Sequence, residues 1–457
     1  MLLALLTAVL GPVIITGYSD LHSARSALTE ERLSDAGRLY ASAARKLFWR
    51  KDLWEQAGMA AYRAGDKDSS IRLLDIARQK DSLSAQGWIT LGTVFWINHD
   101  VTNAVSIWKS GLQSFPDSVL LYDQLIMVYY AQNDFASEQD ALTKRLALGE
   151  DAVAHYRLGL LLTLSDVQRA QQEFNAASSL DSEFKSVTTT LLFTLKAAEL
   201  ESDPARGAVV IGRGLGLVEE WALASKAFER AVNLDGANAE AWAWLGEARQ
   251  HLGQDGSKEL DKALSLDPGD SIVHALRGLY WKRQEDYSNA LAEYQWAAQI
   301  EPKNPAWQVS IGEAYTLYGD LVSALSAYQK AISLAPNDTS YLRLLALFCA
   351  DNDVQVLDIG LPAAQKAIEL APDDPQVLDA LGYSYLKGGY LYNAEKNLLK
   401  AVKVAPEFAQ AHIHLAETYL QKGDRTSAYN ELKLARQFDT NGLTGQLAIQ
   451  LLMQYFP

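Results

Sequence analysis

Apolar residues recur along this chain at intervals of three and four positions, and the whole pattern returns about every 34 residues. A small residue is followed three positions later by an aromatic or apolar residue, as in "IGEAY" (311–315). Such spacing places the apolar side chains on one face of an α-helix. The pattern therefore predicts an array of amphipathic helices. Its small residues are Gly58, Gly92, Gly159, Gly212, Gly246, Gly278, Gly312, Gly382 and Ala416.

A second helix follows the first in each unit. Turns such as "YGD" (318–320) separate the two, because Gly fits the left-handed end of one helix and Asp caps the next. An Ala lies twelve residues after the small residue in six units: Ala104, Ala224, Ala290, Ala324, Ala394 and Ala428. Prolines that stop the second helix recur at Pro268, Pro302, Pro336, Pro372 and Pro406. Each unit thus predicts helix A, a tight turn and helix B.

The repeated motif resembles that of the tetratricopeptide repeat family, in its membrane-anchored bacterial type. The matching stretches are "WLGEA" (244–248), "IGEAY" (311–315), "LGYSY" (381–385) and "LAETY" (415–419), and the resemblance covers about residues 17–440. The resemblance implies an all-α fold, a right-handed α-solenoid of about a dozen helix-turn-helix repeats. It also implies that helices A line a concave groove.

Breaks in the spacing suggest how the array is divided. Gly159 and Gly212 are 53 residues apart, and the extra material predicts an irregular helix at 183–204 that joins two blocks. The N-terminal block covers 18–182 and the C-terminal block covers 205–440. An apolar stretch at 441–457 predicts a capping helix, because the open end of a solenoid exposes an apolar face.

The first 17 residues carry no charged side chain. At 1.5 Å per residue they reach about 25 Å, the short end of what spans a bilayer. We expect an apolar helix at 1–17 that acts as a single-pass membrane anchor, with the side of the membrane left open. A cleaved signal peptide and a buried capping helix are the alternatives, although no basic residue precedes Arg25 as a signal peptide would favour.

Composition and motifs argue against several kinds of site. The formal net charge of -15 disfavours binding to nucleic acid, which requires a basic face. One cysteine, Cys349, allows neither an internal disulfide nor a zinc site with two thiolates, and we interpret it as a core residue. The glycine-rich "AVVIGRGLGLVEE" (208–220) fits the repeat pattern better than a phosphate loop. We therefore predict a non-enzymatic protein without catalytic, cofactor-binding or metal-binding residues.

The groove offers the candidate binding residues. By the resemblance, the slot after the core aromatic position of helix A points into the groove, and in three consecutive units it holds Tyr62, Trp96 and Tyr130. Met59 and Met127 lie three positions earlier in two of these units. Aromatics recur at binding hot spots and Met suits adaptable surfaces. We expect a protein or peptide segment to bind this aromatic ladder, unless its side chains pack against each other or a neighbouring turn.

These observations predict a membrane-tethered scaffold or assembly factor that binds partner proteins. Two alternatives stay open at this point. The chain could be a permanent subunit of a larger membrane complex, or the repeat portion of a membrane glycan-assembly enzyme system. Homo-oligomers are also compatible with the sequence.

Overall fold

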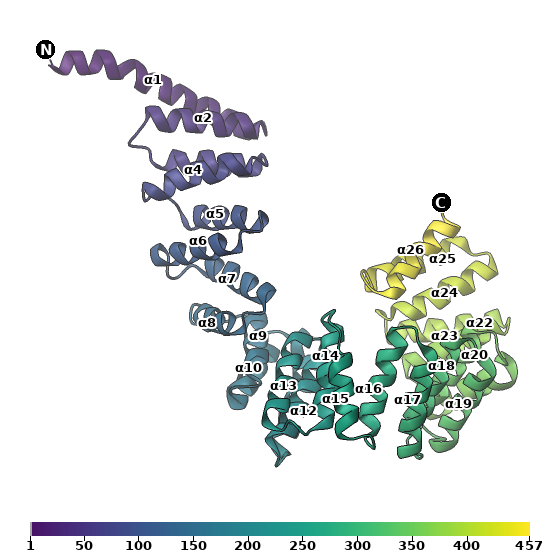
Figure 1. The fold of residues 1–457 in the computed structure, drawn as a ribbon. Coiled ribbons are helices and arrows are strands. Elements are labelled where there is room, and N and C mark those ends of the chain that lie inside the picture. Colours follow the sequence, from purple (N-terminus) through teal and green to yellow (C-terminus); the bar gives the residue numbers. More distant parts are fainter. Residues whose placement is uncertain (1) are drawn as a thin grey trace. The chain divides into compact units, whose positions relative to one another are not determined.

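The computed structural model describes residues 2–457, and the side chains from residue 11 onward. Every regular element in this described part is a helix, as predicted. The chain divides into two compact units. The first contains the residues up to 202 together with 210–224, and the second contains 203–209 and 225–457. Figure 1 shows the helices of each unit stacked in chain order.

Helices A and B alternate through the first unit. Its elements are α1 (Leu2–Thr29), α2 (Leu33–Lys46), α3 (Asp52–Arg63), α4 (Lys67–Gln79), α5 (Ala85–Ile97), α6 (Val101–Ser114), α7 (Val119–Gln132), α8 (Phe135–Leu146), α9 (Ala152–Leu162), α10 (Val167–Leu180), the 3₁₀ turn η1 (Ser182–Phe184) and α11 (Lys185–Leu200). Helices α12 (Pro204–Leu217) and α13 (Trp221–Leu234) contain the borders between the units. The predicted irregular segment thus contains one helix, α11.

The second unit continues the alternation. Its elements are α14 (Ala239–His251), α15 (Ser257–Leu266), α16 (Ser271–Arg283), α17 (Tyr287–Ile300), α18 (Pro305–Tyr318), α19 (Leu321–Leu334), α20 (Thr339–Asp351), η2 (Val356–Gly360), α21 (Leu361–Leu370), α22 (Pro375–Lys387), α23 (Leu391–Val404), α24 (Ala409–Lys422), α25 (Arg425–Phe438) and α26 (Leu443–Tyr455). A single π-helical turn, η2, leads directly into α21. Helix α26 packs its buried Ala448 against α24 and α25.

The small and large positions of a repeat interlock between helix A and helix B. In the α5–α6 pair the indole of Trp108 fills the space beside Gly92, where an added Cβ would overlap it. Trp108 is fully buried, and its indole N–H donates a hydrogen bond to the Ile89 carbonyl oxygen at 3.2 Å. The same contact recurs in other helix pairs, where Leu74 lies beside Gly58, Phe174 beside Gly159, Tyr294 beside Gly278, Tyr328 beside Gly312 and Leu398 beside Gly382.

Asp residues at the turns cap the B helices. The Asp100 carboxylate accepts a hydrogen bond from the backbone N–H of Asn103 at 3.2 Å, which satisfies a donor in the first turn of α6. The same cap recurs at Asp66, Asp134, Asp166, Asp286, Asp320 and Asp424. The turn motif read from the sequence thus has the predicted structural role.

Residues 208–220 form a helix and a turn rather than a phosphate-binding loop. Helix α12 runs through Gly212, Gly214 and Gly216 without interruption. An added Cβ at Gly214 would overlap the side chain of Thr194 in α11. Gly214 therefore permits close packing of α12 against α11, which accounts for a glycine in a helix interior despite its cost there.

The first helix extends beyond the predicted apolar segment. Helix α1 continues from Leu2 to Thr29, and Leu21, Ala24 and Ala27 are buried in the core that it shares with α2. Within the described residues, none of the helices combines the length and apolar character that crossing a bilayer requires. The predicted anchor at 1–17 is therefore not supported by the structure. Most of it, residues 1–10, lies outside the residues whose side chains are described.

Candidate functional site

Three consecutive A helices of the first unit, α5, α7 and α9, carry exposed apolar side chains. Leu120 on α7 and Val153 on α9 are 58% and 63% exposed, and both occupy the same repeat position. The B helices α4, α6 and α8, which the structure describes throughout, have no large hydrophobic side chain that is exposed. We call this surface the A-helix face, and its members are Ile97, Leu120, Met127, Tyr130 and Val153.

The predicted aromatic ladder overlaps this face only in part. Tyr130 is 53% exposed and Met127 is also exposed, as a contact surface requires. Tyr62 is half-buried, and Met59 and Trp96 pack against the core formed by α4–α8. Met59 and Trp96 therefore pack against neighbouring side chains, which was the alternative to a binding role, whereas Met127 and Tyr130 on α7 are open to solvent.

Tyr130 lies against a buried ionic network. The Arg157 guanidinium lies 4.5 Å from the centroid of the Tyr130 ring, a cation–π contact. The same guanidinium donates two hydrogen bonds to the Glu138 carboxylate, at 2.6 and 3.1 Å. Its Nη1 donates to Glu220 at 2.8 Å. Three elements, α7, α8 and α9, and the turn before α13 thus hold the ring in position.

Burial shapes the electrostatics of this network. Burial raises the pKa of Glu138, and the opposing effect of the Arg157 ion pair does not cancel it. Burial lowers the pKa of Arg157, but its bonds to Glu138 and Glu220 outweigh burial and raise it overall. Arg157 therefore stays charged and is fully engaged by its neighbours, so its contribution to the A-helix face is to position Tyr130.

Arg157 and Glu138 were not identified as site residues from the sequence. A usable indication was present, because Glu138 stands twelve residues after Ile126, in the position that holds Ala in six other units. A carboxylate in such a buried slot needs a cationic partner. The identity of that partner was not encoded in the local pattern.

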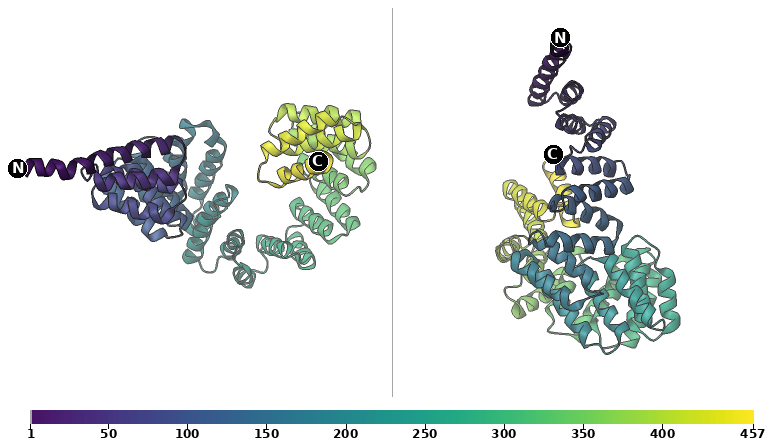
Figure 2. Two further views of the ribbon diagram at one scale, coloured as in Figure 1. Left: turned by 90° about the horizontal axis from the view of Figure 1, so that it is seen from above. Right: turned by 90° about the vertical axis from the view of Figure 1, so that its left-hand side faces the viewer.

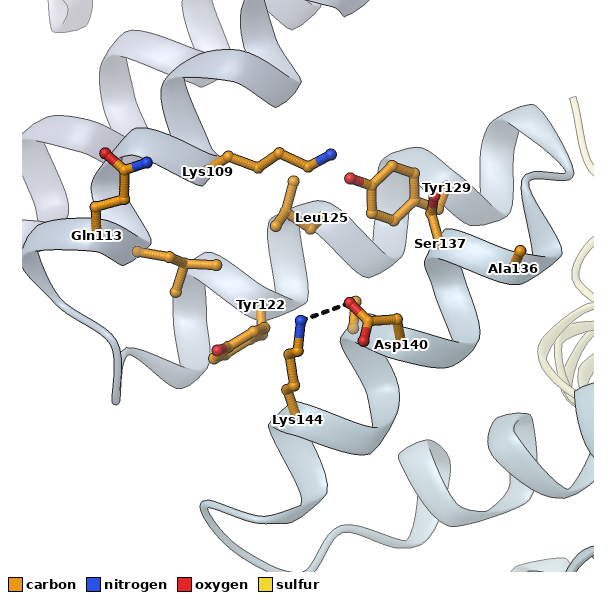
Figure 3. A pocket seen from close by; sticks show the side chains of 11 residues that line it. Lys109, Gln113, Tyr122, Leu125, Tyr129, Ala136, Ser137, Asp140 and Lys144 are labelled. Carbon is orange, nitrogen blue, oxygen red and sulfur yellow. Dashed lines mark hydrogen bonds and ion pairs between the residues drawn. The ribbon is translucent and has the colours of Figure 1, made fainter.

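An open pocket of about 570 Å³ lies between α6, α7 and α8 (Figure 3). Tyr122 and Leu125 form part of its wall, and Lys144 is paired with Asp140 at 2.7 Å beside them. A similar pocket between α17, α18 and α19 is lined by residues at the equivalent repeat positions, such as Gln308 for Tyr122 and Ile311 for Leu125. The pocket is therefore a recurring product of helix stacking, and we do not treat it as the binding site.

Histidines of the second unit tie helices A to helices B. His274 contacts Glu293 through Nδ1 at 2.6 Å, and His412 contacts Glu431 in the same way at 2.5 Å. The hydrogen bond to Glu293 raises the pKa of His274. Burial lowers the pKa of His412, but its contact with Glu431 outweighs burial and raises the value overall.

We expect these pairs to make the second unit less stable at alkaline pH. A histidine with a raised pKa in the folded state stabilises most below its unfolded value of about 6.5, and this contribution is lost as pH rises through the folded value. The urea midpoint of the second unit should therefore decrease from about pH 6 to about pH 8.5. The double variant His274→Gln/His412→Gln should lose part of that decrease, with His22→Gln on α1 as control. An unchanged decrease in the double variant would contradict the assignment.

A third histidine lies in a buried polar cluster. The Nδ1 atom of His414 is 2.8 Å from the Asp379 carboxylate, and its ring stacks on Tyr383 with centroids 3.8 Å apart. Burial raises the pKa of nearby Asp351, against the lowering effect of Tyr383.

Across the described residues, no group of three or more His, Cys, Asp or Glu side chains is arranged to hold a metal ion. Burial likewise raises the pKa of the Cys349 thiol to about 11.

Comparisons with known proteins identify the repeats. Three segments match family models described as tetratricopeptide repeat: residues 56–118, 283–348 and 375–408. The predicted resemblance is confirmed for these segments. The finer prediction of a membrane-anchored bacterial type finds no support in the comparisons.

The curated relatives are much longer proteins. Superkiller complex protein 3 of Homo sapiens is 25% identical over 297 residues, which are 61% of this chain and 17% of that protein. Anaphase-promoting complex subunit 3 of Dictyostelium discoideum is 25% identical over 119 residues, which are 25% of this chain and 12% of that protein. The chain thus spans less than a fifth of the length of these relatives.

The solved structures that match this chain are distant from it in sequence. The crystal structure of the APC/C hetero-tetramer Cut9–Hcn1 has a TM-score of 0.45 and 14% identity, and the match covers 95% of both chains. The yeast Tom70 structure has a TM-score of 0.43 and 14% identity, with 96% of this chain and 95% of that chain covered.

Proposed function

We propose that this chain is a protein-interaction scaffold, a right-handed tetratricopeptide repeat array whose A-helix face in the first unit binds an apolar segment of a partner protein. The observation that carries the proposal is the presence of exposed apolar side chains on α5, α7 and α9, whereas the B helices α4, α6 and α8 have none. Surfaces of this kind commonly mark sites of protein interaction.

The chemistry of the face defines the class of partner. Covering exposed apolar surface is worth about 25 cal/mol per Å² removed from water, so a segment with aliphatic or aromatic side chains is favoured. The contact between Tyr130 and Arg157 holds the ring before binding, which lowers the entropy cost of ordering it. The net charge of -15 further favours a partner segment with basic flanks.

The proposal is tested by selecting peptides from a random display library on the full protein. Selected peptides should bind Met127→Glu and Tyr130→Ala at least about tenfold more weakly than wild type, because hot-spot truncations typically cost 2 kcal/mol or more. Tyr62→Ala, Trp96→Ala and Met59→Ala should have smaller effects on binding, because these side chains are half-buried. Lys109→Ala, at the pocket between α6, α7 and α8, is the matched control. Equal binding by wild type and the α7 variants would contradict the proposal.

Membrane tethering by residues 1–17 is a separate part of the proposal. It is supported by the absence of charged side chains over that stretch. An integral anchor keeps the full chain in the membrane pellet after alkaline carbonate extraction. Complete release into the supernatant would contradict it. The alternative of a permanent subunit in a membrane complex predicts co-purification at fixed stoichiometry that survives high salt.

A further inference from the structure

The segment that joins α2 to α3 is rich in cations and aromatics. Residues 45–51, the last two residues of α2 and the turn after it, read Arg-Lys-Leu-Phe-Trp-Arg-Lys, with four cations and two aromatics in seven positions. Several equivalent turns contain acidic and small residues instead, such as 267–270 (Asp-Pro-Gly-Asp) and 371–374 (Ala-Pro-Asp-Asp). This local charge also contrasts with the net charge of -15 for the whole chain. We call residues 45–51 the basic-aromatic turn.

The aromatic side chains of this turn face solvent. Phe48 is 71% exposed and Trp49 is 44% exposed, and their rings make an edge-to-face pair with centroids 5.1 Å apart. Leu47 between them and α2 is fully buried against Gly17 of α1. The turn is therefore fixed at its base by Leu47 while both large rings stay outside the core, which is unfavourable in water unless another apolar environment covers them.

Two cations precede the ring pair along the chain and two follow it. Lys46 is paired with Asp20 at 2.6 Å, and Arg50 binds Asp52 through two hydrogen bonds of 2.9 and 2.8 Å. Arg45 and Lys51 are exposed on either side of the turn. This part of the surface thus combines exposed aromatics with an excess of positive charge.

The turn lies where α1 leaves the helical array. Gly17 of α1 packs against Leu47, so the part of α1 before Gly17 extends past the end of α2. Figures 1 and 2 show this N-terminal part of α1 projecting beyond α2. On the described part of the projection, Val13 and Ile15 are exposed, and Tyr18, next to Gly17, is exposed as well. Exposed apolar side chains of α1 therefore continue the surface that Phe48 and Trp49 begin.

We propose that the basic-aromatic turn binds the surface of a bilayer that contains anionic phospholipids. In this arrangement Phe48 and Trp49 enter the boundary between headgroups and acyl chains, which Trp favours because its ring is amphipathic. Arg45 and Lys51 contact the headgroup phosphates, to which cations near an anionic surface are attracted. The inference is independent of the scaffold proposal. It extends the tether proposal without requiring α1 to cross the membrane, because the turn acts at the interface.

The test is flotation of the full chain with two kinds of vesicle, phosphatidylcholine alone and phosphatidylcholine with about one third phosphatidylserine. Wild type should bind the anionic vesicles several-fold better than the neutral ones. Arg45→Gln/Lys51→Gln should lose about tenfold or more of the binding to anionic vesicles at low salt, because each cation near the surface adds to the attraction. Phe48→Ser/Trp49→Ser should weaken binding to both kinds of vesicle. Lys67→Gln/Arg72→Gln on α4 removes two exposed cations elsewhere in the same unit and is the matched control.

Each outcome decides the proposal. Circular dichroism identifies any variant that has lost helicity. Such a variant is replaced in the test by the conservative variant Trp49→Phe or Arg45→Lys. Each of these keeps the aromatic ring or the positive charge and should bind vesicles as wild type does. Equal flotation of wild type and both double variants would overturn the proposal, because the N-terminal segment alone would then carry the binding. Failure of wild type to bind either vesicle would overturn it as well. If vesicle binding depends on anionic lipid and alkaline carbonate releases the protein from membranes, the result would support binding through the basic-aromatic turn and contradict the integral anchor.

Discussion

Replacing Arg157 by Ala is expected to destabilise the first unit by about 3–5 kcal/mol, because the change leaves Glu138 buried without its partner. Glu138 is fully buried, so its carboxylate would have to take up a proton or draw water into the space between α8 and α9. The loss should appear as faster hydrogen exchange in residues 119–162, followed by mass spectrometry at several urea concentrations. A local measurement is required because long repeat arrays need not unfold in one step.

A double variant separates the cost of the unpaired charge from the loss of packing. Glu138→Ala restores the residue that other repeats have at this position, so Glu138→Ala/Arg157→Leu removes both charges and keeps apolar volume. We expect the double variant to regain most of the stability that Arg157→Ala loses, because replacing a buried ion pair with apolar residues is often neutral. Equal destabilisation in the single and the double variant would contradict the assigned role of the pair.

Replacing Trp108 by Ala is expected to cost about 3–5 kcal/mol, because it opens a cavity between α5 and α6 where the buried indole packs beside Gly92. The change also leaves the Ile89 carbonyl without the donor of its 3.2 Å hydrogen bond. Urea unfolding monitored by hydrogen exchange in residues 85–114 measures the effect. Trp49→Ala, which removes an exposed indole of the same unit, is the control and should cost less than about 1 kcal/mol. Similar costs for both would contradict the interlocking account of the core.

The repeated parts of the fold were predictable because each depends on residues close in the chain. The spacing from Gly92 to Trp108 places a small residue of helix A beside a large one of helix B, and the structure joins these two. At many turns an Asp caps the following helix through its own carboxylate, which accepts from the backbone N–H three residues later, as Asp100 does from Asn103.

The parts that were not predictable depend on distant residues. The partners of Arg157 are 19 and 63 residues away, and helical periodicity identifies a face without identifying what lies against it. The exposure of the aromatic ladder differs from unit to unit for the same reason, since Trp96 packs against core residues whereas Tyr130 meets Arg157 at the surface.

The sequence indicated that the first helix continues past residue 17, but the appearance of charged residues after that position led to a shorter predicted helix. Asp20 follows the apolar stretch closely, and a boundary at residue 17 was expected there. Leu21, Ala24 and Ala27 continue the spacing of an amphipathic helix, and these side chains are buried in the structure. The charged residues that begin at Asp20 lie outside the buried face of this helix. They do not end the helix, because α1 continues to Thr29.

The central claim, that partners bind the A-helix face of the first unit, is tested most directly by site-specific photo-cross-linking. A benzoyl-phenylalanine placed at position 130 on α7 reports contacts at this face, and one placed at position 109 on α6 reports contacts at the pocket between α6, α7 and α8. With a peptide selected on the wild-type protein, the account predicts cross-links from position 130 and few from position 109. Efficient cross-linking from position 109 with none from position 130 would contradict it.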